Sequence, residues 1–279
     1  MSRKLLAQIN RHTRFHGRTD DPVYLKLARM REKLPRYEPG RFQFPFGELR
    51  YADIASLESQ YLEIFVQRGY AFTPMRPAPR ILDCGANIGL AAIWFAKTYP
   101  DARITAFEPG PELHSLLRAN LEASGFAGVD AVQAAVWNEN GEVPFGHDRA
   151  DAGRIIKDHE KGRTVPALRL ADHIGAPVDL LKLDVEGAEF EVVLDLAETG
   201  KLGQIQALIC EVHALPEEAD KVGELILNLH GSGMMVSTAY ARSAPALFNA
   251  ARPTPFEALS DGKYLMHLYA WREPENDSA

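Results

Sequence analysis

The amino-acid sequence predicts an α/β fold built on a sheet of seven strands, mostly parallel, with the last strands antiparallel. Two observations carry this prediction. From Arg80 onward, short apolar runs alternate with segments of helical periodicity. The turn from Gly85 to Gly89 directly follows the first apolar run, as strand-to-helix turns do in parallel βαβ units.

The elements follow from this alternation in chain order. Residues 138–170 interrupt it with Asn140-Gly141 and scattered charge, which indicates a hairpin insertion. The predicted strands span 81–85, 103–108, 129–136, 178–184, 205–212, 233–239 and 263–271, and the predicted helices span 88–98, 110–124, 187–199 and 216–230.

The first 79 residues are predicted to form a mainly helical extension of one large domain, residues 80–279. A chain of 279 residues with 46% apolar residues can bury a full core. Ile54, Leu57 and Tyr61 recur at helical spacing after Asp53, so a helix is expected that ends near residue 69. Three prolines at 74, 77 and 79 then break regular structure and mark the boundary.

The charge is divided unevenly along the chain. The net charge is −7, yet residues 1–41 hold eleven Lys or Arg against four Asp or Glu. The acidic remainder disfavours a nucleic-acid partner. No apolar run approaches eighteen residues, and Cys84 and Cys210 both sit in apolar runs. We expect a cytoplasmic protein without a membrane span or disulfide; the oligomeric state stays open, and a homodimer is compatible with it.

The turn after the first predicted strand has the composition of a cofactor loop. Asp83 ends the strand, and the two glycines, Gly85 and Gly89, allow close backbone approach to a ligand. A dinucleotide site has a third glycine, and Asp83 would repel its pyrophosphate. A ligand with a sulfonium and an ammonium group suits the loop better, which predicts S-adenosylmethionine. Glu108 ends the next strand, where it can accept hydrogen bonds from both ribose hydroxyls.

Four segments of the sequence resemble the FkbM-type methyltransferases of the class I S-adenosylmethionine-dependent superfamily. They are Asp83-Cys84-Gly85-Ala86-Asn87-Ile88-Gly89, Phe107-Glu108-Pro109, Ala135-Val136-Trp137-Asn138-Glu139 and Leu181-Lys182-Leu183-Asp184-Val185-Glu186-Gly187-Ala188-Glu189. The resemblance implies a Rossmann-like class I fold and an O-methyltransferase of sugars, polyketides or other natural products. It implies a cofactor site at Asp83, Gly85, Asn87 and Glu108, to which we add the neighbouring motif residues Ala86, Gly89, Pro109 and Ala135.

A second group of polar residues follows the strands predicted at 178–184 and 205–212. Asp184 and Glu186 come after the first, and Glu211 and His213 lie at the end of the second. The carboxyl ends of parallel strands meet at one crevice, where open α/β sheets bind ligands. Lys182, inside an apolar strand, needs a carboxylate partner or a functional task. Glu211 is a candidate partner, and we count Lys182 among the candidate catalytic residues.

Methyl transfer to a hydroxyl needs a general base, for which we favour His213 over Glu186 and Asp184. A competing interpretation is that Asp184 and Glu186 only cap the following helix. The same cluster is compatible with Mg²⁺, but the spacing does not demand a metal, and none is predicted.

The sequence therefore predicts an S-adenosylmethionine-dependent O-methyltransferase that acts on a small-molecule acceptor. Three alternatives stay open. They are a nucleic-acid or N-methyltransferase on the same fold, an NAD-dependent oxidoreductase, and a fold kept as a binding scaffold. The acceptor itself is not encoded in any recognisable motif.

Overall fold

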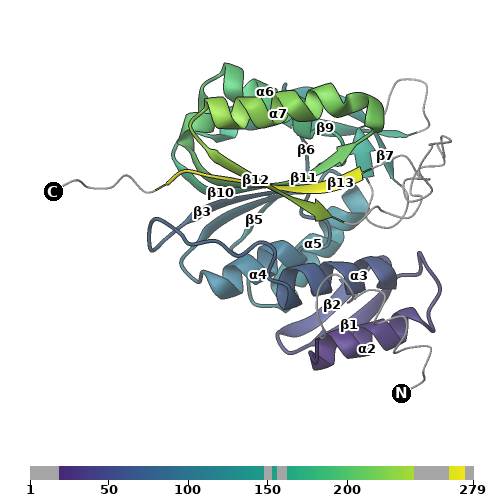
Figure 1. The fold of residues 1–279 in the computed structure, drawn as a ribbon. Helices are drawn as coiled ribbons and strands as arrows, with labels where there is room; N and C mark the ends of the chain where they lie inside the picture. Colours follow the sequence, from purple (N-terminus) through teal and green to yellow (C-terminus); the bar gives the residue numbers. More distant parts are fainter. Residues whose placement is uncertain (1–18, 148–152, 156–161, 242–263, 274–279) are drawn as a thin grey trace.

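The computed structural model describes residues 19–147, 153–155, 162–241 and 264–273, and within them a central seven-stranded sheet (Figure 1). The strand order is β12-β13-β11-β10-β3-β4-β5. All neighbouring pairs are parallel except β11 with β13 and β12 with β13. The prediction of a mostly parallel sheet with antiparallel last strands is confirmed. The strands are β3 (Arg80–Cys84), β4 (Arg103–Phe107), β5 (Asp130–Val132), β10 (Val178–Leu183), β11 (Ile205–Ala214), β12 (Met235–Ala241) and β13 (Tyr264–Trp271).

Helices cover both faces of this sheet, with α6 and α7 on one face and α4 and α5 on the other (Figure 1). All six residues of β10 are buried, as expected for a strand covered on both faces. Short 3-10 turns, η2 (Leu170–His173), η3 (Lys201–Gln204) and η4 (Pro216–Glu218), adjoin the later elements. The helices are α4 (Leu90–Thr98), α5 (Pro111–Ala123), α6 (Glu189–Glu198) and α7 (Ala219–Gly231).

The strand predicted over 129–136 is wrong as a single element. The chain leaves the central sheet after Val132, whose carbonyl accepts hydrogen bonds from the backbone N–H groups of Glu108 and Ala134. Residues 135–137 then join a second, four-stranded sheet of order β6-β9-β7-β8. The region predicted as a hairpin therefore contains three strands that pair with a fourth. The strands are β6 (Ala135–Trp137), β7 (Gly141–His147), β8 (Gly153–Ile155) and β9 (Arg163–Arg169).

The N-terminal segment contains a β-hairpin besides its helices. Asp53 caps the expected helix by accepting a hydrogen bond from the backbone N–H of Ser56, at 2.9 Å. That helix continues into a π-helical turn at Leu62 and ends at Val66, before the expected residue 69. The elements are α2 (Pro22–Arg31), β1 (Gly40–Phe44), β2 (Gly47–Tyr51), α3 (Ile54–Tyr61) and the π-helical turn η1 (Leu62–Val66).

One hydrophobic core joins this segment to the central sheet. Leu27, Leu49 and Leu57 are fully buried in the same cluster as Leu90 of α4 and Leu117 of α5. Burial of such side chains contributes about 2 kcal/mol each. In this core η1 packs against α4. Residues 62–70 therefore lie near the carboxyl edge of the central sheet. The domain boundary at residue 79 stays a prediction, and residues 1–18 lie outside the described part.

Candidate active site

The loop between β3 and α4 lies at the carboxyl edge of the sheet, where it passes close to the loop after β10. The backbone N–H groups of Gly85 and Ala86 both donate to the carbonyl of Phe107, at 3.0 and 2.9 Å. Gly85 has φ +80°, and a Cβ at this position would overlap the carbonyl oxygen of Asp184. The residue is therefore glycine for two reasons, its conformation and the close approach of a second loop.

Glu108 links this loop to the end of β4. Its carboxylate accepts hydrogen bonds from the backbone N–H groups of Asn87 (2.9 Å) and Gly110 (2.8 Å). Burial raises its pKa to about 7 against the opposing effect of these bonds. A carboxylate has about four acceptor positions, so two remain for ribose hydroxyls. Pro109 follows Glu108 and is half-buried.

Ala135, the remaining residue of the expected cofactor site, begins β6. Its side chain packs with Val143 and Phe145 in the core of the second sheet. Packing in that core gives no support to a role for this side chain at the cofactor site.

Asp83, Lys182 and Asp184 form a buried charged group beneath the loop. The Lys182 ammonium lies 3.3 Å from Asp83 Oδ1, 3.3 Å from Asp184 Oδ2, and donates to the carbonyl of Gly85 at 2.7 Å. Neither oxygen of the fully buried Asp83 has a hydrogen bond of good geometry within the described residues. An unsatisfied buried carboxylate beside a glycine turn fits a cationic ligand group.

The sequence-based pairing of Lys182 with Glu211 is wrong. In the register of the sheet Lys182 lies beside Asp83 and Ile209, and its ion pairs are with Asp83 and Asp184. Glu211, two residues further along β11, acts on Lys182 only as a more distant charge. Burial lowers the pKa of Lys182, but Asp184 and Asp83 outweigh this effect and raise it above its ordinary value. Lys182 is therefore an ammonium ion held by two carboxylates.

His213 lies among three carboxylates. Its Nδ1 is 3.1 Å from Glu189 Oε1, and its Nε2 is 3.4 Å from Glu186 Oε2 and 3.6 Å from Glu211 Oε1. Burial lowers the pKa of His213, but these carboxylates raise it well above 6.5. Burial also raises the pKa of Glu186 to about 8, against the effect of His213. The sequence pattern brings His213 and Glu186 to one crevice, but it assigns no role to Glu189.

The competing interpretation of Asp184 and Glu186 as helix caps does not match the geometry. α6 begins after Ala188 and has no side-chain cap. Glu189 instead accepts hydrogen bonds from the backbone N–H groups of Val185 (3.2 Å) and Gly187 (2.8 Å). Glu186 has φ +55°, a left-handed conformation that is uncommon outside glycine and recurs at functional sites.

Two further charged residues of the crevice, His267 and Glu63, were not predicted from the sequence. His267 of β13 lies 3.2 Å from Glu211 Oε2, and Glu63 Oε1 of η1 lies 3.4 Å from the same His267 Nε2. Tyr70 is buried against the same region, with the Lys182 ammonium 5.8 Å from its ring centre. Only the antiparallel register of β11 and β13, which places His267 opposite Glu211, could have indicated that these two side chains meet.

Two sets of donor atoms lie within 4.8 Å of one another, one from Asp184, Glu211 and His213 and one from Glu63, Glu211 and His267. Each imidazole already faces carboxylates at ion-pair distance. These contacts already pair the carboxylates of both sets with an imidazole, so we assign no metal to them. Metal independence stays a prediction.

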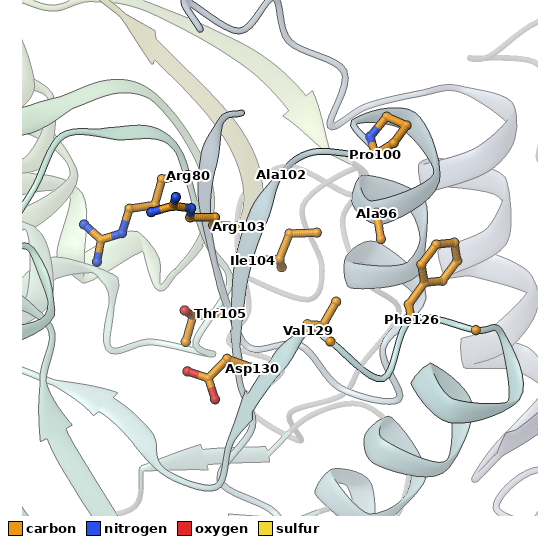
Figure 2. A pocket seen from close by; sticks show the side chains of 12 residues that line it. Arg80, Ala96, Pro100, Ala102, Arg103, Ile104, Thr105, Phe126, Val129 and Asp130 are labelled. Carbon is orange, nitrogen blue, oxygen red and sulfur yellow. The ribbon is translucent and has the colours of Figure 1, made fainter. Parts of the chain in front are cut away.

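A surface hollow of about 450 Å³ lies at the other end of the strands (Figure 2). It is lined by Arg80 and Arg103, which begin β3 and β4, and by Ile104, Phe126 and Asp130. Because open α/β sheets bind ligands at the carboxyl ends of their strands, this hollow is not the expected reaction site. Within the described ranges, no helix combines the length and apolarity that crossing a membrane would require.

Comparison with known proteins points to one family. The family model described as "Methyltransferase FkbM domain" matches residues 83–234. Methyltransferase sdnD of Sordaria araneosa is 32% identical over 190 residues, which are 54% of this chain and 73% of that protein. The 31-O-demethyl-FK506 methyltransferase FkbM of Streptomyces tacrolimicus is 28% identical over 66% of this chain and 85% of its own.

The chain also aligns in part with solved structures. Methyltransferase FkbM from Methylobacillus flagellatus aligns over 78% of this chain and 53% of its own, with 13% identity and a TM-score of 0.48. The matched segment 83–234 contains every residue of the predicted site. It contains neither Glu63 nor His267.

Proposed function

Because the chain belongs to the FkbM methyltransferase family, and is therefore an S-adenosylmethionine-dependent methyltransferase, we propose that it methylates a hydroxyl group of a small metabolite, sugar or natural product. The observation that carries this proposal is the His213 cluster beside the Asp83–Gly89 loop. A hydroxyl group must lose its proton to an acceptor during methyl transfer. The amine of a nucleobase does not need a proton acceptor as strong as this cluster.

We assign the cofactor to the loop after β3 and the end of β4. Asp83 would face the positively charged part of S-adenosylmethionine, and Glu108 would accept hydrogen bonds from its ribose. Gly85, Ala86, Asn87 and Gly89 would allow the close backbone approach. When bound, the cofactor supplies an electrophilic methyl group on a sulfonium.

His213 is the proposed general base. His213 Nε2 would take the proton of the acceptor hydroxyl as its oxygen becomes the nucleophile for the methyl group that the cofactor would supply. Nδ1 faces Glu189, so Nε2 is the nitrogen turned toward Glu186 and Glu211. Glu186 and Asp184 remain alternative bases, since burial raises the pKa of both carboxyl groups.

The charge of the crevice disfavours the nucleic-acid alternative. Five carboxylates lie within ion-pair distance of Lys182, His213 or His267 in addition to Asp83, and a phosphate backbone would be repelled there. Membership of the family decides against an NAD-dependent oxidoreductase.

The test is release of S-adenosylhomocysteine with a panel of hydroxylated, amine and carboxylate acceptors, each with and without a chelator. We expect release with hydroxylated acceptors, undiminished by the chelator, and loss of release in His213→Gln. Release with amines alone would overturn O-methylation. Inhibition by the chelator, reversed by Mg²⁺, would overturn the metal-free assignment.

A further inference from the structure

Glu63, Glu211 and His267 form a second polar group at the carboxyl edge of the sheet, which we name the outer triad. Glu63 comes from η1, Glu211 from β11 and His267 from β13. Their side chains are 24%, 18% and 19% exposed, close to the 18% of His213. The triad side chains are therefore partly exposed, to about the same extent as the proposed base, although Glu63 Oε1 itself is shielded.

The triad is not satisfied by its own contacts. Glu63 Oε1 is shielded from solvent and, within the described residues, has no hydrogen-bond partner of good geometry, although His267 Nε2 lies 3.4 Å away. A purely structural ion pair would satisfy that oxygen. Glu63 is also presented by a π-helical turn, a feature that is frequent at functional sites and that shifts side chains relative to a regular helix.

Glu211 connects the triad to the proposed base. Its Oε1 faces His213 Nε2 at 3.6 Å, and its Oε2 faces His267 Nε2 at 3.2 Å. An acceptor hydroxyl placed at His213 would therefore have its neighbouring hydroxyl at the triad. Carboxylates accept hydrogen bonds from hydroxyl and ammonium groups, and they repel carboxylate and phosphate groups.

We infer that the outer triad is the acceptor-selecting subsite, and that it takes a compound with neighbouring hydroxyl groups that is uncharged or carries an ammonium group. This inference rests on the proposed function. Two of its three residues lie outside the segment that the family model matches, so the family match does not assign this subsite. Glu63 and Glu211 outnumber the single imidazole of His267, so compounds with a phosphate or carboxylate next to the reacting hydroxyl are disfavoured above pH 7, where Glu63 is mostly ionised.

The test uses matched acceptors that differ only in charge, built on a sugar and on an aromatic diol. Each set has an uncharged, an amino, a carboxylate and a phosphate member, and S-adenosylhomocysteine release is measured for each. We expect release with the uncharged and amino members only. In Glu63→Gln and His267→Gln, KM for an accepted compound should rise about tenfold or more, because a charged hydrogen bond is lost. The Kd for S-adenosylmethionine, measured by calorimetry, should stay within about twofold.

Glu122→Gln, an exposed carboxylate of α5, is the matched control and should change neither quantity. Equal or faster release with an anionic member, or an unchanged KM in both triad variants, would overturn the triad assignment while leaving O-methylation intact. Cofactor binding without release from any hydroxylated member would instead overturn the proposed function. Circular dichroism establishes that each variant is folded.

Discussion

Glu189 Oε1 lies 3.1 Å from Nδ1 of His213, and the same buried carboxylate accepts hydrogen bonds from two backbone N–H groups of the loop after β10. Glu189 thus connects α6, that loop and β11 through one side chain. A carboxylate at Nδ1 makes this nitrogen the proton donor and leaves Nε2 to face the crevice. We interpret Glu189 as a positioning residue for His213.

The first prediction concerns the pH dependence of methyl transfer. If His213 is the base, the rate rises with pH as His213 loses its proton, and Glu186, Glu189 and Glu211 together place that rise above the ordinary value of 6.5. Glu189→Gln removes one of these charges and should move the rise about one pH unit toward acid. The measurement is the pH profile of kcat/KM from pH 5.5 to 9.5.

Glu191→Gln is the control for this experiment, because Glu191 lies on the same helix and its Oε1 is 4.0 Å from Lys221, away from His213. Its profile should match that of the unmodified protein. A profile unchanged in Glu189→Gln, with only a lower maximum, would show that Glu189 acts through structure alone. Glu189→Asp keeps the negative charge. If the charge is what matters, the kcat/KM profile of this variant should rise at a pH closer to that of the unmodified protein than the profile of Glu189→Gln does.

The second prediction concerns Asp83 and the affinity for S-adenosylmethionine. Asp83→Asn removes a buried acidic group that has an ion pair with Lys182 but no hydrogen bond of good geometry within the described residues, and that we assign to the cationic part of the cofactor, so the Kd should rise about tenfold to a hundredfold. Isothermal calorimetry measures it. Asp179→Asn is the control, since Asp179 is equally buried at the amino end of β10 and holds Arg76 and Arg80. A similar Kd change in both variants would point to a general structural effect.

The third prediction concerns Glu108. Because its pKa is raised to about 7, most of the ionisation of its carboxyl group takes place between pH 6 and 8. Ribose hydroxyls bind better to an ionised carboxylate, so affinity for S-adenosylmethionine should increase over this range by up to about tenfold. Glu108→Gln should bind more weakly and without this increase. A pH dependence that persists in Glu108→Gln would have to come from another group.

The sheet was predictable because each of its strands carries a local pattern. Val178 to Leu183 is apolar apart from Asp179 and Lys182, and all six residues are buried. The strand predicted over 129–136 failed because the pattern does not show where the chain changes sheets, which depends on the partner strand at each residue. The β1–β2 hairpin was missed because its burial is completed by α5, far along the sequence.

The candidate site was predictable as a set of residues but not as a set of contacts. His213 and Glu186 do meet, since the ends of β10 and β11 are neighbours in a parallel sheet. The partner of Lys182 depends on register, which a single sequence does not encode. Glu63 lies inside an apolar helical pattern, which gives no sign that the chain forms a π-helical turn there or that Glu63 contacts His267.

The fourth prediction concerns the stability of the buried group around Lys182. Lys182→Met would leave Asp83 and Asp184 without their shared cation, and breaking a buried ion pair in this way lowers the free energy of unfolding by about 3 kcal/mol or more. Lys182 lowers the pKa of both carboxyl groups, so its removal raises these values further above those of the unfolded chain. Such groups stabilise the folded protein at low pH and lose that contribution as pH rises through the folded pKa.

The loss in Lys182→Met should therefore be larger at pH 8 than at pH 5, as measured by urea denaturation. Adding Asp83→Asn should recover part of the stability at pH 8, because it removes one of the two uncompensated charges. Equal losses at both pH values, with no recovery in the double variant, would contradict this prediction. The buried apolar stem of Lys182, which belongs to β10, would then hold the loop at Gly85 by packing, and the charge of its ammonium group would contribute little.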